Sequence, residues 1–428
     1  MFPLSSANCI VDTDAVYRLQ IFAAYTGDLT LATPTFTVIK SLNLNNGVFR
    51  KAATVTGNAQ LLLDDVLGVG ATGTILTAEF HGVDLVVGGS GDSQASLTIR
   101  ASITQPLPVA FDSAVLYNYD ILDWQGNTIA LSGHATIDNY GIADILGNAA
   151  FTDNPFPIQR PTNSYCYNNY NLTTFIGGSP IFLSVQNTGE MVVRTNTKFS
   201  GNYYSAGTTE VRNTTLELAG KAEQVGGTFI LADSAATVKP SGQGNVLNIY
   251  DGSIVGTGKV DGNLTLGVDP NGGDPFGGMW QPSPVINPGF AGAAQGDPPI
   301  SGTLTITQSF EMFSYYGTPV CTMLIDVTAS GGYDKVAVTG WAHLSGALRL
   351  NPSPVYKPMS GTRLDFLTSG SFEGTDFDEA TSTYWGSWAE PGSSNPVKPV
   401  KWTLTKTAST YSLLAELIVG SGPPGGGS

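Results

Sequence analysis

The sequence predicts an all-β chain that coils into stacked turns, a β-solenoid, and three observations support this. Short segments carry apolar residues at every second position, which is typical of strands with one buried face. Glycines interrupt these segments repeatedly, and repetition of this kind indicates a stacked architecture. The composition agrees, because 52 Gly and 25 Pro accompany 41% hydrophobic but only 12% charged residues. Low charge with this apolar content argues against a disordered chain.

Residues 1–104 are predicted as an N-terminal β region. Segments such as Val16–Ile21 and Thr74–Phe80 are rich in strand-forming residues, and turn signals recur about every 8–12 residues. The segment Leu42–Gly47 ends in an Asn-Gly pair, which favours a tight turn. A β-sandwich would produce the same spacing. This region is therefore either the start of the solenoid or a separate small β domain.

Residues 105–350 are predicted as the main solenoid, with a boundary at Gln105–Pro108. Two phrases, Asn139-Tyr140-Gly141 and Asn187-Thr188-Gly189, each stand between two strand-like segments. Asn and Gly both accept left-handed backbone geometry, so we interpret these phrases as corners. Residues 151–179 and 268–299 are long and rich in Pro, Gly or Asn, and we expect them to project from the stack as loops.

The stretch from Ser253 to Leu350 is the most regular and carries a family resemblance. In order, it contains Gly256-Thr257-Gly258-Lys259-Val260-Asp261-Gly262-Asn263-Leu264, Asn287-Pro288-Gly289, Gly302 to Phe310, Tyr333-Asp334-Lys335-Val336-Ala337-Val338-Thr339-Gly340, and Leu344 to Leu348. This ordered series resembles the C-terminal part of autotransporter-type passenger proteins, without the membrane-embedded translocator of that family. The resemblance covers the C-terminal half. It implies a right-handed parallel β-helix in a surface-exposed protein.

Residues 351–418 are predicted as a β cap. The open end of a strand stack exposes unpaired backbone groups and has to be covered. This region is less repetitive than the stack and contains Trp385, Trp388 and Trp402. Residues 419–428 have the Gly/Pro-rich composition of a flexible tail.

Charge and hydropathy limit which partners and which location the sequence favours. With 34 acidic and 19 basic residues the net charge is −15, which disfavours nucleic acid as a partner. No run of about 18 apolar residues suggests a membrane span, and Met1–Ala7 does not read as a signal peptide. We expect an extracellular or cell-surface location. The alternative is a virion surface, since assembly into a virus particle needs no leader.

The sequence offers little catalytic or metal-binding chemistry. The three histidines, His81, His134 and His343, lie far apart, and the three cysteines have no zinc-site or disulfide spacing. The one adjacent aspartate pair, Asp64-Asp65, lacks the further motifs of β-helical polysaccharide hydrolases. Calcium ligation by Asp92, or by Asp269, Asp274 and Asp297, is weaker than their interpretation as solvated turn residues. We therefore predict no enzyme activity, no cofactor and no metal.

Candidate binding residues lie in the predicted loops. Tyr165, Tyr167, Tyr170 and Trp280 could stack on sugars, although packing of the loops on the stack would also explain them. Three sequons place candidate N-glycosylation sites at Asn171, Asn213 and Asn263.

These expectations favour a non-enzymatic structural or adhesive protein. It would be a rigid β-helical stalk, fibre or filament component that displays loops for attachment or assembly. Its partners would be other copies of itself, neighbouring surface or coat proteins, and glycans. One alternative is a virion spike or minor capsid protein, and a second is a carbohydrate-active β-helix enzyme.

Overall fold

The computed structural model describes residues 8–64, 70–89, 95–100, 108–148, 150–153, 167–267, 283–289, 301–313, 321–353, 356, 358–374, 376–377, 385–388 and 398–417. Among them nearly every regular element is a β-strand, and the one helical turn described is η1 (Gln243–Asn245). The chain divides into two units, Met1–Ala222 with Ser241–Gln243, and Glu223–Pro240 with Gly244–Ser428. The predicted all-β fold is confirmed, and each unit forms part of a parallel β-helix.

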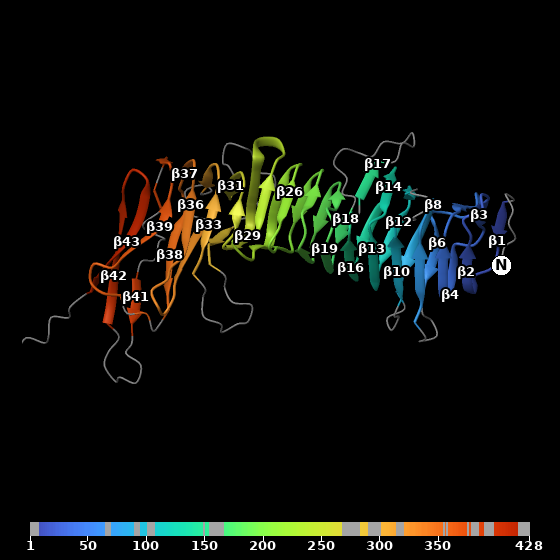
Figure 1. Ribbon diagram of the computed structural model, residues 1–428, viewed down its shortest axis with the longest axis horizontal. Helices are drawn as coiled ribbons and strands as arrows, with labels where there is room; N and C mark the ends of the chain where they lie inside the picture. Colours follow the sequence, from blue (N-terminus) through green and yellow to red (C-terminus); the bar gives the residue numbers. More distant parts are fainter. Residues whose placement is uncertain are drawn as a thin grey trace, which may run out of the picture. The chain divides into compact units, whose positions relative to one another are not determined.

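The first unit stacks its strands in three parallel columns, to which each turn of the coil contributes (Figure 1). Column A contains β1 (Cys9–Val11), β3 (Asp28–Leu31), β5 (Val48–Lys51), β8 (Ala78–His81), β11 (Val109–Asp112), β14 (Thr128–Ser132), β17 (Ala150–Asp153), β20 (Ile181–Phe182), β23 (Thr197–Phe199) and β26 (Thr215–Leu218). Column B contains β2 (Ala15–Ile21), β4 (Thr35–Leu44), β6 (Ala59–Leu63), β9 (Val83–Val87), β12 (Val115–Asn118), β15 (Thr136–Asn139), β18 (Tyr167–Asn169), β21 (Val185–Asn187) and β24 (Tyr203–Ser205). Column C continues from the second halves of β2 and β4 into β7 (Thr72–Ile75), β10 (Ser96–Arg100), β13 (Ile121–Gln125), β16 (Ile142–Leu146), β19 (Leu172–Ile176), β22 (Glu190–Val193) and β25 (Thr208–Val211).

Alternating side chains build the core of this unit. In β12 and β15 the second and fourth residues are buried while the first and third are half-exposed, as strand pleating requires. The in-register pairing stacks like residues, so that the Phe80 ring lies 5.2 Å from Phe49 and 4.9 Å from Phe111 between centroids. The parallel pairing begins at β1 with β3, and therefore the N-terminal region belongs to the solenoid rather than to a separate β domain.

Two of the predicted loops are shorter than expected. In the range 151–179, β18 and β19 occupy residues 167–169 and 172–176, and most of β17 precedes them. Val285–Asn287, inside the range 268–299, forms strand β32. The loop prediction is wrong at these positions. Asn168 and Asn169 of β18 ordinarily argue against a strand but pair in parallel with the preceding turn. In β32 the apolar Val285 and Ile286 pair in parallel with the following turn.

The second unit contains β27 (Ala222–Leu231), apart from its first residue, and three further parallel columns. One column contains β28 (Thr237–Pro240), β30 (Lys259–Val260), β33 (Thr303–Ile306), β36 (Lys335–Val338) and β39 (Arg363–Thr368). Another contains the first half of β29 (Val246–Gly256), then β31 (Asn263–Leu266), β34 (Phe310–Met312), β37 (Trp341–His343) and β40 (Ser371–Glu373). The last contains the second half of β29, then β32, β35 (Thr322–Val327) and β38 (Ala347–Pro352).

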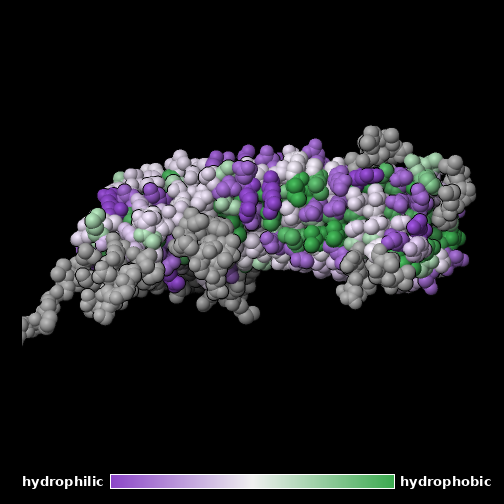
Figure 2. Space-filling view, turned by 60° about the horizontal axis from the view of Figure 1, so that its bottom comes forward, coloured by the Kyte–Doolittle hydropathy of each residue, from purple (hydrophilic) through white to green (hydrophobic). Residues whose placement is uncertain are grey.

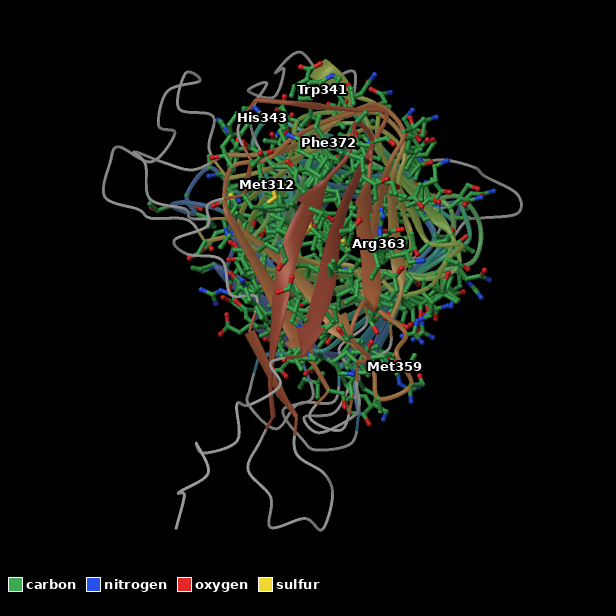
Figure 3. The ribbon with its side chains drawn as sticks, turned by 90° about the vertical axis from the view of Figure 1, so that its left-hand side faces the viewer. Met312, Trp341, His343, Met359, Arg363 and Phe372 are labelled. Atoms are coloured by element: carbon green, nitrogen blue, oxygen red, sulfur yellow. The ribbon has the colours of Figure 1, made fainter. Side chains whose placement is uncertain are left out.

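Antiparallel pairing ends the second unit, but β39 and β40, which lie within the predicted cap at residues 351–418, still pair in parallel with β36 and β37. The strand β43 (Thr410–Leu417) pairs antiparallel with both β39 and β42 (Lys398–Lys406), and β42 pairs with β41 (Trp385–Trp388). The Tyr411 ring of β43 stands edge-on to Phe372 of β40 at 4.6 Å between centroids. Figure 3 shows Phe372, Trp341 and His343 at this end of the unit, and the buried Met312 inside the coil.

Candidate functional site

A row of buried asparagines follows the corner between columns B and C in the first unit. We call Asn118, Asn139, Asn169 and Asn187 the asparagine ladder. All four are fully buried. Each side-chain amide donates to the amide oxygen of the next, at 2.7 Å from Asn118 to Asn139, 2.9 Å from Asn139 to Asn169 and 2.8 Å from Asn169 to Asn187.

Each ladder amide also donates to a backbone carbonyl of the following turn. The acceptors are Ile142, Leu172, Glu190 and Thr208, at 2.8–3.0 Å. A buried amide without partners would destabilise the fold, while a connected row holds successive corners in one register. At the start of the row, the Oδ1 atom of Asn118 has no hydrogen-bond partner among the described residues. The residue paired with Asn118 in the preceding turn is Val87, which has no amide to donate.

The two Asn-x-Gly phrases are corners, as predicted, but for a different reason. Neither Asn139 nor Asn187 has a positive φ, and neither Gly141 nor Gly189 lies in the left-handed region. The asparagines are needed for their buried amides. The glycines are needed because the turns approach closely, so that a Cβ atom at Gly189 would lie 2.1 Å from the carbonyl oxygen of Asn171.

On the outside of the same corner, one residue after each of three ladder asparagines, stands a row of tyrosines. We call Tyr119, Tyr140 and Tyr170 the tyrosine ladder. Tyr119 and Tyr140 stack with ring centroids 5.1 Å apart and planes 9° apart, and Tyr140 and Tyr170 with values of 4.5 Å and 5°. Their exposed fractions are 44%, 39% and 40%. Each column B strand ends at its buried Asn, and the exposed Tyr follows directly at the turn, so the buried row sets the spacing of the exposed one.

Apolar and acidic side chains flank the tyrosine ladder. Two residues after Tyr119 and Tyr140, on column C, the exposed Ile121 and Ile142 are paired in register. On column B, Asp138 accepts a hydrogen bond from Asn168 at 2.8 Å. Burial raises the pKa of Asp138, and burial together with the nearby Asp138 charge raises the pKa of Tyr140 to about 12. Tyr140 thus presents a neutral hydroxyl group beside the Asp138 carboxyl group. Figure 2 shows hydrophobic residues exposed among polar ones on one face of the molecule.

The four predicted sugar-binding residues differ in their exposure, and two of them lie outside the described residues. The prediction for Tyr167 is wrong, because this residue is fully buried and its hydroxyl group lies 2.7 Å from Thr173 Oγ1. Tyr170 is exposed, but one ring face packs against Tyr140. Tyr165 and Trp280 lie outside the described residues. Stacking between neighbours covers both faces of Tyr140, so this residue offers its ring edge and hydroxyl group rather than an open platform for sugar stacking.

The sequence interpretation missed Tyr119 and Tyr140, although a signal was present. The phrases Asn118-Tyr119-Asp120-Ile121, Asn139-Tyr140-Gly141-Ile142 and Asn169-Tyr170-Asn171-Leu172 repeat the pattern Asn-Tyr-x-aliphatic. The unequal spacing of the three phrases, 21 and 30 residues between asparagines, hides the repeat.

The three sequons occupy different surroundings. Asn171 is exposed at the corner beside Tyr170, and its amide donates to the Tyr140 carbonyl at 3.2 Å. Asn213 is exposed, with a positive φ of 51°. Asn263 is half-buried, and its amide donates to the Gly244 carbonyl at 2.8 Å while its Oδ1 accepts from Ser309 Oγ at 2.7 Å. A glycan on the Asn263 amide nitrogen would crowd this half-buried, hydrogen-bonded side chain.

Ser132, Asp112 and His81 lie together but are not arranged as a nucleophile with its base. Ser132 Oγ donates to Asp112 Oδ1 at 2.9 Å, and the other Asp112 oxygen lies 3.3 Å from His81 Nδ1. The carboxylate therefore stands between hydroxyl and imidazole, whereas activation of a serine requires the imidazole to contact the hydroxyl. Asp64 is buried, while Asp65, Asp92, Asp269, Asp274 and Asp297 lie outside the described residues.

A buried carboxylate pair occurs in the second unit. Asp334 accepts from the backbone N–H groups of Gly302 and Asp326, each at 3.0 Å. The Asp326 carboxylate accepts from the side-chain amides of Asn287 and Asn351. Burial raises the pKa of Asp334 to about 7. These bonds join three turns of the coil, which is a structural role.

Among the described residues, no group of three or more His, Cys, Asp or Glu side chains is placed to bind a metal ion, and no helix is long and apolar enough to cross a membrane. Comparison with known proteins found no family model that matches the chain and no curated protein with a significant match.

Proposed function

We propose that this chain is a non-enzymatic structural module, a rigid β-helical stalk or fibre component exposed outside the cell. Its outer corner, the tyrosine ladder with Ile121 and Ile142, would serve in attachment or assembly. The observation that carries the proposal is the pairing of the two ladders. The inner amides hold successive turns in register, and the outer aromatic rings repeat at that register.

The physical argument concerns rigidity and exposed surface. Successive turns are joined by parallel backbone pairing, stacked core rings and side-chain amide bonds, so each turn is supported by its neighbours. Outside, large apolar side chains recur in adjacent turns, and contiguous apolar surface favours contact with a partner. The resemblance to autotransporter-type passenger proteins supports a surface-exposed role for a rigid solenoid of this type.

Attachment is tested with a variant of the exposed corner. The Tyr119→Ser/Ile142→Ser double variant changes only exposed side chains, and Tyr17→Ser, in a residue 50% exposed on β2, is the matched control. We expect the double variant to reduce self-association in sedimentation experiments, or binding to immobilised polysaccharides, while Tyr17→Ser leaves both unchanged. If the unmodified chain, the double variant and Tyr17→Ser associate and bind polysaccharide equally, the outer corner has no role in attachment.

Enzyme activity and location are tested separately. The purified chain is incubated with pectin, alginate and chitin, and reducing or unsaturated ends are measured. Turnover that is lost in Asp138→Asn or Asp64→Asn would contradict the non-enzymatic proposal. Protease treatment of intact producing cells should digest the chain, and its protection until lysis would contradict the exposed location.

A further inference from the structure

We propose that Tyr140 and Tyr170 form a site of oxidative cross-linking, where a peroxidase with hydrogen peroxide joins the two rings as dityrosine within one chain. This modification would fasten two successive turns of the coil covalently. It rests on the geometry of the tyrosine ladder alone and does not depend on the proposed function.

The arrangement of the two rings favours this bond. Their centroids are 4.5 Å apart and their planes differ by 5°, the closest and most parallel pair of the ladder. A new bond at an aromatic carbon forms along the p orbital, perpendicular to the ring, so face-to-face rings direct these orbitals at each other. The Tyr140–Tyr170 pair is stacked face to face, so the ring carbons next to the hydroxyl groups can meet across the stack.

The fold holds the pair in place and keeps it accessible. The Tyr170 backbone N–H donates to the Asn139 carbonyl at 2.8 Å, and the Asn139 and Asn169 amides bond beneath the rings. About two fifths of each side chain is exposed, 39% for Tyr140 and 40% for Tyr170, so an oxidant can reach both. The negative charge of Asp138 acts on both phenols, and a nearby negative charge favours loss of an electron.

The chemical step balances with hydrogen peroxide as the oxidant. Each phenol loses one electron and its hydroxyl proton to give a phenoxyl radical. The two radicals form a carbon–carbon bond between the positions adjacent to their oxygens. The two hydrogens on those carbons then move to the oxygens and restore both aromatic rings. Two electrons and two protons reduce one hydrogen peroxide to two water molecules, so the chain loses two hydrogen atoms.

Other tyrosines of the first unit are less suited. Tyr117 lies 6.3 Å from Tyr119 between centroids with planes 15° apart. Tyr167 and Tyr203 are buried, and their hydroxyl groups bond to Thr173 and Thr209. Tyr17, which is exposed on β2, serves as the control for oxidation of an exposed tyrosine outside the ladder. Its ring lies beneath the Arg18 guanidinium, with Arg18 Cζ 5.6 Å from the ring centroid.

The experiment treats the dilute full chain with peroxidase and hydrogen peroxide and measures dityrosine fluorescence. Peptide mass spectrometry then locates the link. We expect a link between the peptides that contain Tyr140 and Tyr170, a loss of two hydrogens, and a yield per chain that does not depend on protein concentration. Tyr170→Phe and Tyr140→Phe keep the stacked rings but remove one phenol, and should each lower the yield at least fivefold. Tyr17→Phe should leave it unchanged.

Three results would overturn the proposal. The first is an unchanged yield in Tyr170→Phe. The second is a product found only as covalent dimers, with a yield that rises with protein concentration. The third is the absence of dityrosine, or a link confined to Tyr119 and Tyr140, in the unmodified sequence.

Discussion

The Asn139 amide donates to Asn169 Oδ1 at 2.9 Å, although 30 residues separate the two in sequence. This bond joins the corners of two turns. It also sets the stacking of Tyr140 on Tyr170, because each tyrosine follows its asparagine directly. The interior and exterior of this corner are therefore coupled through single residues.

Replacing Asn169 by Ala should destabilise the protein by about 3 kcal/mol. The change removes an acceptor of the Asn139 amide and the donor to Asn187 Oδ1, both of which are buried. Asn171→Ala is the control, since its exposed amide makes one bond, and should cost less than about 1 kcal/mol. Denaturant unfolding measures both losses of stability. Equal losses in the two variants would show that the asparagine ladder does not stabilise the protein more than an exposed amide does.

Replacing Val87 by Asn should extend the ladder by one turn. Val87 pairs in register with Asn118, whose Oδ1 has no partner among the described residues, and a new amide there could donate to it. A double-mutant cycle with Asn118→Val should give a favourable coupling of about 1 kcal/mol. A coupling near zero would mean that water or another group already satisfies Asn118.

Gly189→Ala should cost about 3 kcal/mol, because its Cβ would lie 2.1 Å from the Asn171 carbonyl oxygen and force two turns apart. Gly177→Ala is the comparison. Its φ of +74° is unfavourable for Ala, but nothing lies within 4 Å of the added Cβ, so about 1 kcal/mol is expected. If thermal unfolding shows that Gly177→Ala lowers the stability more than Gly189→Ala, close approach of the turns is not what requires glycine at position 189.

The Asp334 carboxyl group should make the protein less stable as the pH rises from about 4 to 7. Burial raises the pKa of Asp334 to about 7, so in this window the folded state holds a proton that the unfolded chain has lost. The contribution is complete below the unfolded pKa and is lost as the pH passes through the folded value. Asp334→Asn should flatten this dependence in urea midpoints measured across the range. An unchanged slope would assign the effect to other carboxylates.

Expression through a eukaryotic secretory pathway should attach glycans at Asn171 and Asn213, which are exposed, and leave little folded protein glycosylated at Asn263. Glycopeptide mass spectrometry measures the occupancy, and Asn171→Gln should remove one glycan mass. High occupancy at Asn263 in the folded fraction would mean that its hydrogen bonds to Gly244 and Ser309 do not protect it from modification.

Asn139, Tyr167 and Tyr170 show which features could be predicted from the sequence and which could not. The phrase Asn139-Tyr140-Gly141 predicts a corner correctly, but its asparagine serves as a buried amide rather than through left-handed backbone geometry. The sequence interpretation treats Tyr167 and Tyr170 alike as loop residues, whereas Tyr167 is buried in β18 and Tyr170 is exposed at the turn that follows this strand. Composition makes this segment resemble a loop, and its pairing with β15 and β21 makes it a strand.

The sequence by itself determined the all-β class, the repeated coil and the different character of the end, because alternation, glycine corners and low charge are local properties. Only the tertiary structure decided which side chains stack. Successive ladder asparagines are 21, 30 and 18 residues apart, since the loops between turns differ in length. Parallel backbone pairing brings these uneven positions into one register, and that register creates both the buried amide row and the exposed tyrosine row.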